Sequence, residues 1–208
     1  MLSKLVRLPA RAFRHVFLDQ SYESYYPSDV WERKYRDEHY DLGDPQEDGR
    51  YGALLQVLRR YDHGPMLDLG CGDGLLWKHY RPLSNSLLVG VDYSETAVAK
   101  ANSLALPSAE FRAGDYRTLD AGRKFAVAVF NESLYYINDF LDAIVKAESW
   151  LDDRGVVVVS MFDTLVTRRI WKRLVERRRW IQSLSVQDHR SKRMWTIRVF
   201  AGPGTTRP

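Results

Sequence analysis

The sequence predicts a doubly wound α/β domain, in which helices cover both faces of a mostly parallel sheet. Apolar runs of strand length lie at 66–69, 87–91, 125–130 and 156–162, and a weaker run lies at 109–112. Helical patterns separate these runs at 74–80, 94–102 and 138–151. Short apolar strands that alternate with amphipathic helices are typical of a parallel sheet buried on both faces.

Length and composition bound the class of protein. The chain has 208 residues, of which 45% are hydrophobic and 28% are charged, and this length normally forms one domain. The apolar content excludes intrinsic disorder, and the single cysteine, Cys71, excludes a disulfide scaffold. No apolar run approaches the ~20 residues that span a bilayer. We therefore expect a globular, cytoplasmic protein.

The charge is distributed unevenly along the chain. The net charge is +4, but residues 1–18 carry four bases and no acid, and residues 168–198 carry a net +9. Residues 19–167 consequently carry a net −10. Basic ends around an acidic centre can bring the periphery of the protein to an anionic partner. The acidic centre argues against a nucleic-acid substrate.

The first eighteen residues have an amphipathic pattern. Their four bases, Lys4, Arg7, Arg11 and Arg14, share one helical stripe, and apolar side chains share another. A signal peptide is excluded because no apolar stretch of about 7–15 residues is present. The pattern fits a helix docked on the protein itself, a mitochondrial presequence in a eukaryote, or an interfacial membrane helix. We predict peripheral contact with an anionic membrane through residues 1–18 and 168–179.

Residues 1–50 are interpreted as an N-terminal helical extension and lid, and residues 51–208 as the main domain. Trp31 and Tyr35 are four residues apart and would share one helix face. At the other end of the chain, a helix is expected at about 165–180. The alternating segment Met194–Phe200 is expected to form a strand that pairs antiparallel at one edge of the sheet.

The strongest motif is the segment Asp68-Leu-Gly70-Cys-Gly72-Asp-Gly74, which follows a strand and opens a helix. Glycines at alternate positions let the backbone turn tightly and approach a ligand. The following helix N-terminus offers N–H groups to an anion. A dinucleotide fingerprint would need a third glycine at position 75, where Leu75 stands. An NAD-binding site is therefore disfavoured.

Two further acids end the next two strands. Asp92 follows the second strand, where a carboxylate can accept hydrogen bonds from ribose hydroxyls in doubly wound folds. Gly114-Asp115-Tyr116 closes the third strand, where an acid can accept from an adenine amine and an aromatic neighbour can cover the ring.

With these motifs in this order, roughly residues 25–165 resemble the class I S-adenosylmethionine-dependent methyltransferases. The resemblance implies a Rossmann-like sheet of seven strands with the last strand antiparallel, and S-adenosyl-L-methionine as cofactor. It implies that Asp68, Gly70 and Gly72 hold the methionine end, Asp92 the ribose, and Asp115 and Tyr116 the adenine. The adjoining residues Cys71 and Tyr93 are included in the predicted cofactor site.

The resemblance adds three more residues to this site. Asn131 ends the fourth strand and would lie near the sulfonium. In the family an N-terminal helix often folds over the cofactor, and the rings of Trp31 and Tyr35 would suit its cation. For these two rings, packing against the edge of the sheet is the alternative.

The segment Phe130–Asp139 (FNESLYYIND) further resembles small bacterial methyltransferases that act on sugars or glycolipid precursors, including rhizobial nodulation N-methyltransferases. Many of these relatives carry a histidine, used by some as a base, where Tyr136 stands. The sequence also has no Asn-Pro-Pro-Tyr or Asp-Pro-Pro-Tyr element after the fourth strand, which argues against methylation of nucleobase amines.

The candidate catalytic residues are Glu132, Tyr136 and Asp163, which fall at the carboxyl ends of strands. A hydroxyl acceptor benefits from a general base, whereas an amine needs only to arrive deprotonated. For Glu132 the alternative is a hydrogen bond to backbone in the adjoining loop. The five histidines show no metal-ligand spacing, so no metal site is predicted.

The sequence therefore predicts an S-adenosylmethionine-dependent methyltransferase acting on an N or O atom of a small molecule, such as a sugar or a phosphate-linked precursor. Two alternatives remain open. The basic C-terminal segment would suit an RNA or protein methyltransferase. The other alternative is a catalytically silent member of the fold that serves as a binding module.

Overall fold

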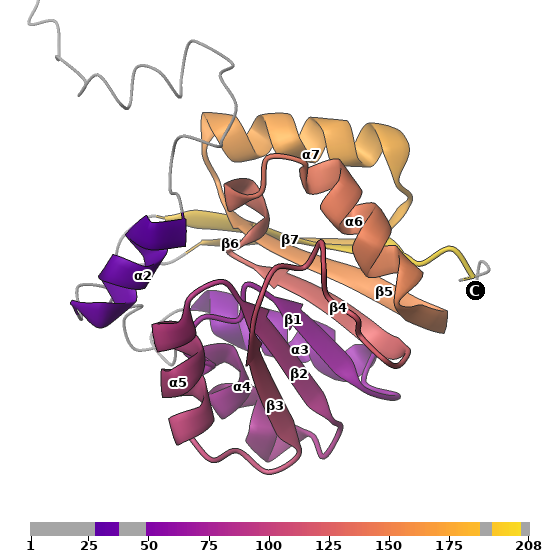
Figure 1. Cartoon of the computed structure of the whole chain (residues 1–208). Helices are drawn as coiled ribbons and strands as arrows, with labels where there is room; N and C mark the ends of the chain where they lie inside the picture. The colour runs from indigo at the N-terminus through magenta and orange to yellow at the C-terminus, as the bar shows by residue number, and fades with distance from the viewer. Residues whose placement is uncertain (1–27, 38–48, 188–192, 205–208) are drawn as a thin grey trace, which may run out of the picture.

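The computed structural model describes residues 28–37, 49–187 and 193–204 (Figure 1). Its seven strands are β1 (Met66–Leu69), β2 (Leu88–Asp92), β3 (Ala109–Ala113), β4 (Phe125–Asn131), β5 (Leu151–Phe162), β6 (Trp180–Gln187) and β7 (Met194–Ala201). The described α-helices are α2 (Ser28–Arg36), α3 (Gly49–Arg60), α4 (Leu75–Tyr80), α5 (Glu95–Ser103), α6 (Phe140–Ser149) and α7 (Leu165–Arg177). Two 3₁₀ turns are η2 (Arg81–Leu83) and η3 (Leu134–Tyr136).

The strands form one sheet in the order β3-β2-β1-β4-β5-β7-β6. The five strands from β3 to β5 are parallel, and β7 is antiparallel to both of its neighbours. The strand order reverses between β1 and β4, and in open α/β sheets ligands bind at the carboxyl ends of the strands at such a point. The predicted seven-stranded, mostly parallel sheet is confirmed.

Two apolar cores lie on the two faces of this sheet. Leu67, Phe125 and Phe130 face the core under α6 and α7, whereas Met66 and Val129 face the core under α3, α4 and α5. Neighbouring strand residues therefore point into different cores. This explains why the central strands read as continuous apolar runs rather than as an alternating pattern.

The C-terminal part of the sheet differs from the prediction. The last strand, β7, does not lie at an edge, because it is inserted between β5 and β6. The helix expected at 165–180 ends at Arg177, and Trp180 begins the edge strand β6. The side chains of β6 alternate between exposed and partly buried, so its apolar content is low. Because this pattern is weak and directly follows an arginine-rich helix end, the sequence did not predict the strand.

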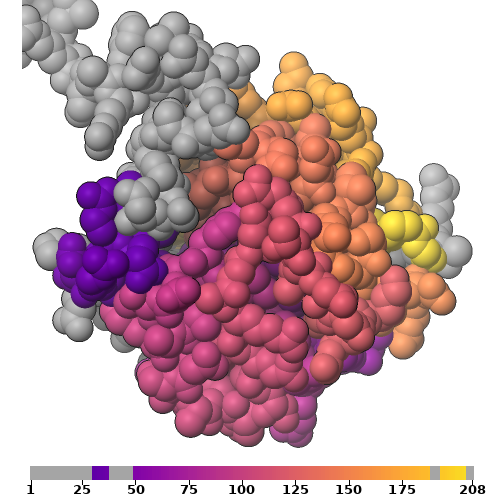
Figure 2. All heavy atoms as spheres, in the orientation of Figure 1, coloured from indigo at the N-terminus to yellow at the C-terminus, as the bar shows by residue number. Residues whose placement is uncertain are grey.

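Helix α2 lies against α5 at the carboxyl edge of the sheet (Figures 1 and 2). It contains both Trp31 and Tyr35, as predicted. Within the described residues, no helix combines the length and apolar character needed to cross a membrane. The predicted helical stripes of residues 1–18 lie outside the described residues.

Candidate cofactor and acceptor site

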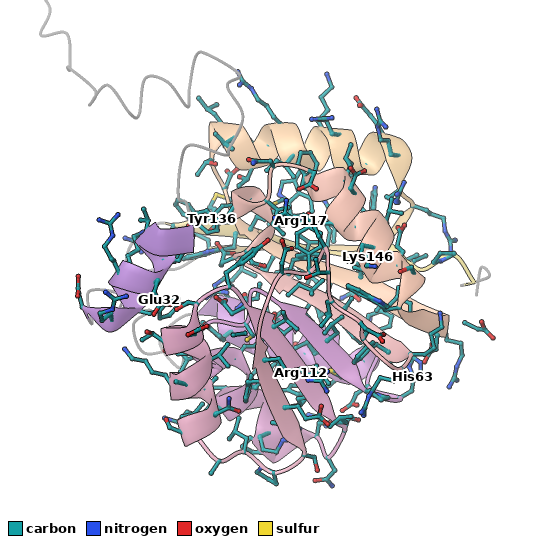
Figure 3. All side chains as sticks on the ribbon, in the orientation of Figure 1. Glu32, His63, Arg112, Arg117, Tyr136 and Lys146 are labelled. Carbon is teal, nitrogen blue, oxygen red and sulfur yellow. The ribbon has the colours of Figure 1, made fainter. Side chains whose placement is uncertain are left out.

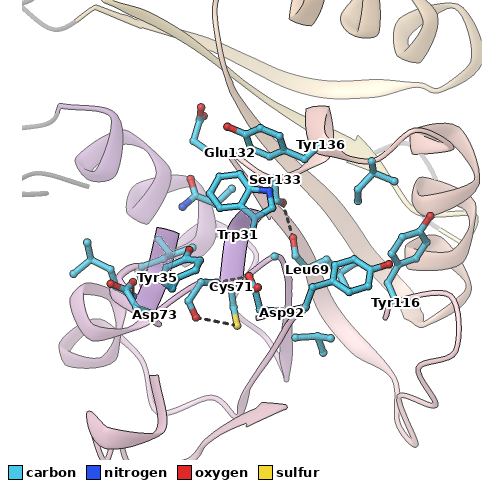
Figure 4. Close-up of a pocket in the computed structure, with 18 of the residues that line it drawn as sticks. Trp31, Tyr35, Leu69, Cys71, Asp73, Asp92, Tyr116, Glu132, Ser133 and Tyr136 are labelled. Carbon is cyan, nitrogen blue, oxygen red and sulfur yellow. Dashed lines mark hydrogen bonds between the residues drawn. The ribbon is translucent and has the colours of Figure 1, made fainter. Parts of the chain in front are cut away.

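A cavity of about 430 Å³ opens at the carboxyl ends of β1, β2 and β4 (Figure 4). The turn after β1, the ends of β2 and β4, and η3 form its floor and walls. Trp31 and Tyr35 of α2, with Arg50 and Tyr51 of α3, line it from the opposite side. Its volume lies within the range of ligand pockets, about 300–1,000 Å³.

The glycine turn after β1 needs its glycines for two reasons. Gly72 has a φ of 54° and Gly70 a φ of 85°, both in the left-handed region that side chains disfavour. A Cβ atom on Gly72 would also lie 2.5 Å from the Tyr35 hydroxyl, and one on Gly70 would collide with Ser133. The turn is therefore closely packed against α2 and η3, and both glycines line the cavity.

Asp92 lines the cavity and is held by the backbone around it. Its Oδ2 accepts the N–H of Gly72 over 2.8 Å, and its Oδ1 accepts the N–H of Ser94 over 2.9 Å. Burial raises the pKa of Asp92, and these hydrogen bonds oppose the shift. An ionised carboxylate can accept about four hydrogen bonds, so Asp92 retains acceptor capacity for a ligand hydroxyl group.

Asp68 does not line the cavity, although it belongs to the same motif. The residue is 1% exposed, and its Oδ1 has no hydrogen-bond partner within the described part of the chain. Burial and the neighbouring Asp92 charge raise the pKa of Asp68 to about 8. Cys71, also in the motif, is buried and contributes to the cavity wall.

The predicted adenine residues behave differently from each other. Tyr116 lines the cavity and donates its hydroxyl to Asp139 over 2.8 Å. Asp115 is not a lining residue, because its carboxylate accepts the Arg117 backbone N–H and forms an ion pair with the Arg117 guanidinium at 2.6 Å. Tyr93 lines the cavity and is 45% exposed, so its ring is available to a planar ligand.

Arg50 is a cavity residue that the sequence reasoning missed. Its side chain is 4% exposed, and its Nη1 donates to Oδ1 of Asn131 over 2.5 Å. The guanidinium carbon lies 4.2 Å from the centre of the Tyr51 ring, a cation–π contact. The only signal in the sequence was an arginine at the start of an apolar helix. The contact with Asn131, 81 residues away, requires the fold.

Glu132 and Tyr136 both line the cavity, as Figure 4 shows. The Glu132 carboxylate accepts hydrogen bonds from the hydroxyls of Tyr135 and Ser160 and from the backbone N–H of Phe162, over 3.0–3.1 Å. Burial raises the pKa of Glu132, whereas the Arg50 charge lowers it. The backbone donor, Phe162, lies at the end of β5 and not in the adjoining loop that the alternative named.

The third candidate catalytic residue lies elsewhere. Asp163 does not line the cavity, and both of its carboxylate oxygens accept from the Arg168 guanidinium, over 2.7–2.8 Å. This ion pair lowers the pKa of Asp163. The structure thus brings Glu132 and Tyr136 together with the predicted cofactor residues and separates Asp163 from them.

The lining residues fit a nucleoside that carries an amino-acid end. Arg50 offers a planar cation to a carboxylate, and Asp92 offers acceptors to a ribose diol. Tyr93 and Tyr116 offer aromatic surface to a base. The unsubstituted glycines let the ligand approach the backbone.

A family model described as "Methyltransferase domain" matches residues 33–201 of the chain. The chain belongs to this family. The predicted class I methyltransferase family and its cofactor, S-adenosyl-L-methionine, are thereby confirmed.

Solved structures show the same fold. The N-methyltransferase NodS from Bradyrhizobium japonicum WM9, in complex with S-adenosyl-L-homocysteine, is 20% identical and has a TM-score of 0.68. The similarity covers 83% of this chain and 98% of NodS. The DhpI–SAH complex is also 20% identical, with a TM-score of 0.63, over 85% of this chain and 95% of DhpI.

Two curated relatives are similar over shorter stretches. The malonyl-[acyl-carrier protein] O-methyltransferase of Bacillus cytotoxicus is 27% identical over 52% of this chain and 40% of its own length. The ubiquinone biosynthesis O-methyltransferase of Bartonella quintana is 31% identical over 55% of this chain and 46% of its own length. The matched part of the chain therefore spans less than half the length of either relative.

Proposed function

We propose that the chain transfers the methyl group of S-adenosylmethionine to a nitrogen or oxygen atom of a small molecule. The observation that carries the proposal is the cavity itself, which the Asp92 carboxylate, the buried Arg50 guanidinium and the glycine turn line together. These two groups match the ribose and the carboxylate of the cofactor. The remaining wall, formed by Glu132, Tyr136 and Trp31, is left for the acceptor.

The chain's own residues would bind and orient the two reactants. When bound, S-adenosylmethionine supplies a methyl group on a positively charged sulfur, which is a good leaving group. Alignment of the acceptor with that methyl group can provide most of the acceleration. Trp31, whose ring centre lies 4.7 Å from that of Tyr136, would exclude water from the reacting atoms.

A nitrogen acceptor fits this wall better than an oxygen acceptor. None of the described residues that line the cavity is a histidine or a lysine, and the candidate base Glu132 already accepts three hydrogen bonds from the protein. When a neutral amine forms its bond to the methyl carbon, the carbon–sulfur bond breaks and positive charge moves to nitrogen. The Glu132 carboxylate and the neighbouring aromatic rings favour such a charge. The resulting ammonium then loses its proton to water.

The relatives support both kinds of acceptor. NodS is named an N-methyltransferase, and both curated relatives are named O-methyltransferases. Within the proposal, an amino sugar or a phosphate-linked precursor is the acceptor class to examine first. We also propose that residues 1–50 act as an extension and lid on a methyltransferase domain at 51–208.

Calorimetry with S-adenosylhomocysteine, followed by transfer of labelled methyl groups, tests the proposal. Acceptors are supplied as matched pairs, such as glucosamine with glucose, and as RNA and protein extracts. We expect the protein to bind S-adenosylhomocysteine and the labelled methyl group to be found on the amine-bearing member of a pair. Failure of the folded protein to bind S-adenosylhomocysteine would contradict the proposal. Binding with no labelled acceptor would favour the silent binding module, and label in RNA or protein would favour the other alternative.

Peripheral contact with an anionic membrane is a further proposal for the basic residues of α7. Arg169, Lys172 and Arg177 are exposed. Two other bases are engaged within the protein, since Arg168 pairs with Asp163 and Arg178 pairs with Glu148. The available positive charge is therefore smaller than the sequence indicated.

A further inference from the structure

Glu32 of α2 points toward α5 and contacts its first turn (Figure 3). Its Oε2 accepts the Ser94 hydroxyl over 2.6 Å and lies 3.4 Å from the Thr96 backbone nitrogen. Its Oε1 accepts the Thr96 hydroxyl. We call this set of hydrogen bonds, which joins residues more than 60 positions apart, the Glu32 latch.

The latch acts on a helix N-terminus that already has a cap. Ser94 is the N-cap of α5, and its Oγ accepts the backbone N–H of Ala97 over 3.0 Å. The same hydroxyl donates to Glu32, so the Ser94 Oγ is a hydrogen-bond acceptor within α5 and a donor to α2. A carboxylate at this position is also stabilised by the positive end of the helix dipole. These hydrogen bonds lower the pKa of Glu32, which keeps the carboxylate charged near neutral pH.

A second polar contact fixes the other end of α2. The Lys100 ammonium donates to the backbone oxygen of Tyr35 over 2.6 Å. Carbonyl groups in the last turn of a helix lack partners within the helix, and a cation satisfies them well. Helix α2 is therefore attached to α5 near its middle, through Glu32, and near its C-terminus.

The latch is connected to the cavity on both sides. On the α2 side, Trp31 and Tyr35 flank Glu32 in sequence and line the cavity. On the α5 side, the N–H of Ser94 donates to Oδ1 of Asp92, the residue suited to the ribose. A continuous series of hydrogen bonds thus joins helix α2 to Asp92 through Ser94.

We propose that Glu32 is a positioning residue that couples closure of α2 over the cavity to occupation of the site at Asp92. The inference rests on the proposed function, since S-adenosylmethionine is the ligand whose ribose would bind Asp92. A ligand that fixes Asp92 and Ser94 also fixes the partner of Glu32. By linkage, the latch then strengthens binding of the ligand by the same factor as the ligand strengthens the latch.

The chain offers variants that separate the latch from general effects on α5. Glu32→Ala removes the latch, and Thr96→Val removes one of its donors with little change of shape. Glu95→Gln is the matched control, because Glu95 is an exposed carboxylate in the same first turn of α5. Glu32→Gln keeps a hydrogen-bond acceptor without the charge and should rescue part of the effect. All variants are made in the full chain.

The first measurement is amide hydrogen exchange of residues 31–36 without ligand and with saturating S-adenosylhomocysteine. We expect ligand to slow exchange of these amides in the wild type and in Glu95→Gln. In Glu32→Ala we expect faster exchange without ligand and little further protection when ligand is added. Equal exchange in Glu32→Ala and Glu95→Gln would overturn the proposal.

The second measurement is the dissociation rate of S-adenosylhomocysteine, followed by stopped-flow fluorescence. Loss of hydrogen bonds to a charged group should accelerate dissociation about tenfold in Glu32→Ala, with a smaller effect in Thr96→Val and little change in the control. If the wild type binds the ligand but Glu32→Ala releases it at the rate of Glu95→Gln, this inference alone fails. If the folded wild type does not bind it, the proposed function fails and the coupling fails with it.

Discussion

The backbone N–H of Gly72 donates to the Asp92 carboxylate, 20 residues further along the chain, over 2.8 Å. This hydrogen bond joins the glycine turn after β1 to the end of β2, so the two predicted cofactor motifs are in direct contact. A change at either residue should therefore disturb the other residue as well, and both disturbances should affect ligand binding. The first two predictions concern these two residues.

Asp92→Asn should weaken binding of S-adenosylhomocysteine by about 1.5–3 kcal/mol, the range for hydrogen bonds to a charged group. The amide has nearly the same shape, but it loses the charge and one acceptor oxygen. Calorimetry measures the change. Asp120→Asn is a suitable control, since Asp120 also accepts a backbone N–H but lies in an exposed turn outside the cavity. Unchanged affinity in a folded Asp92→Asn variant would remove Asp92 from the binding site.

Gly72→Ala should weaken binding of the same ligand, and Tyr35→Phe should partly restore it. The added Cβ atom would lie 2.5 Å from the Tyr35 hydroxyl but 3.5 Å from the ring carbon that carries it. Removing the hydroxyl therefore relieves the collision, while a cost of about 1–2 kcal/mol for the left-handed backbone remains. Gly52→Ala, where the Cβ meets no atom within 4 Å, controls for the substitution itself. Additive effects of the two changes would contradict this packing.

Arg50→Met should weaken binding of S-adenosylhomocysteine at least about tenfold, because a charge-assisted hydrogen bond to the ligand carboxylate is lost. Methylthioadenosine lacks the amino-acid end, and its affinity should change little. Arg50→Lys retains the charge and tests the need for the planar guanidinium. The ratio of the two ligand affinities, measured by calorimetry, decides the outcome. An equal loss for both ligands would show that Arg50 acts only through the structure of the cavity.

Asp68 should make stability depend on pH in a direction opposite to that of an ion-paired carboxylate. Its pKa is raised to about 8 in the folded protein, whereas an unfolded aspartate titrates near 3.9. Between these values the folded state binds the extra proton, so the free energy of unfolding falls as pH rises from about 4 to 8. One proton limits the slope to about 1.4 kcal/mol per pH unit.

Urea unfolding of the wild type and of Asp68→Asn at pH 5 and pH 8 measures this effect. The variant cannot ionise at this position, so its stability relative to the wild type should increase with pH. A constant difference between the two proteins across this range would show that Asp68 is charged in the folded state at pH 5.

The basic surface of α7 should bring the protein to anionic vesicles, at about 1 kcal/mol for each base near the surface. We expect flotation with vesicles that contain phosphatidylglycerol, and none with pure phosphatidylcholine. Replacing Arg169, Lys172 and Arg177 by glutamine should reduce it, and deletion of residues 1–18 tests the predicted N-terminal contribution. If the full chain does not float with anionic vesicles, α7 only solubilises the protein.

Much of the fold is evident in the sequence because it depends on local patterns. The apolar runs of β1, β2, β4 and β5 predict buried parallel strands, and the glycine turn after β1 predicts a ligand site at their carboxyl ends. Backbone conformation in that turn is a property of the residues themselves, since glycine tolerates a positive φ that other residues disfavour. Asp92 follows from the same logic, because it directly ends a strand.

The tertiary structure decided which polar groups meet in the cavity. Arg50 of α3 contacts Asn131 at the end of β4, and Glu32 of α2 contacts Ser94 at the start of α5, only because the fold brings these distant segments together. Asp115 and Asp163 had also been expected in the site, but each forms a local ion pair, with Arg117 two residues away and with Arg168 five residues away, and neither lines the cavity. Strand β7 became internal because β6 pairs with its free side. Local periodicity records which residues are apolar and how the backbone turns, whereas strand neighbours and contacts such as Arg50–Asn131 depend on distances between segments far apart in the chain.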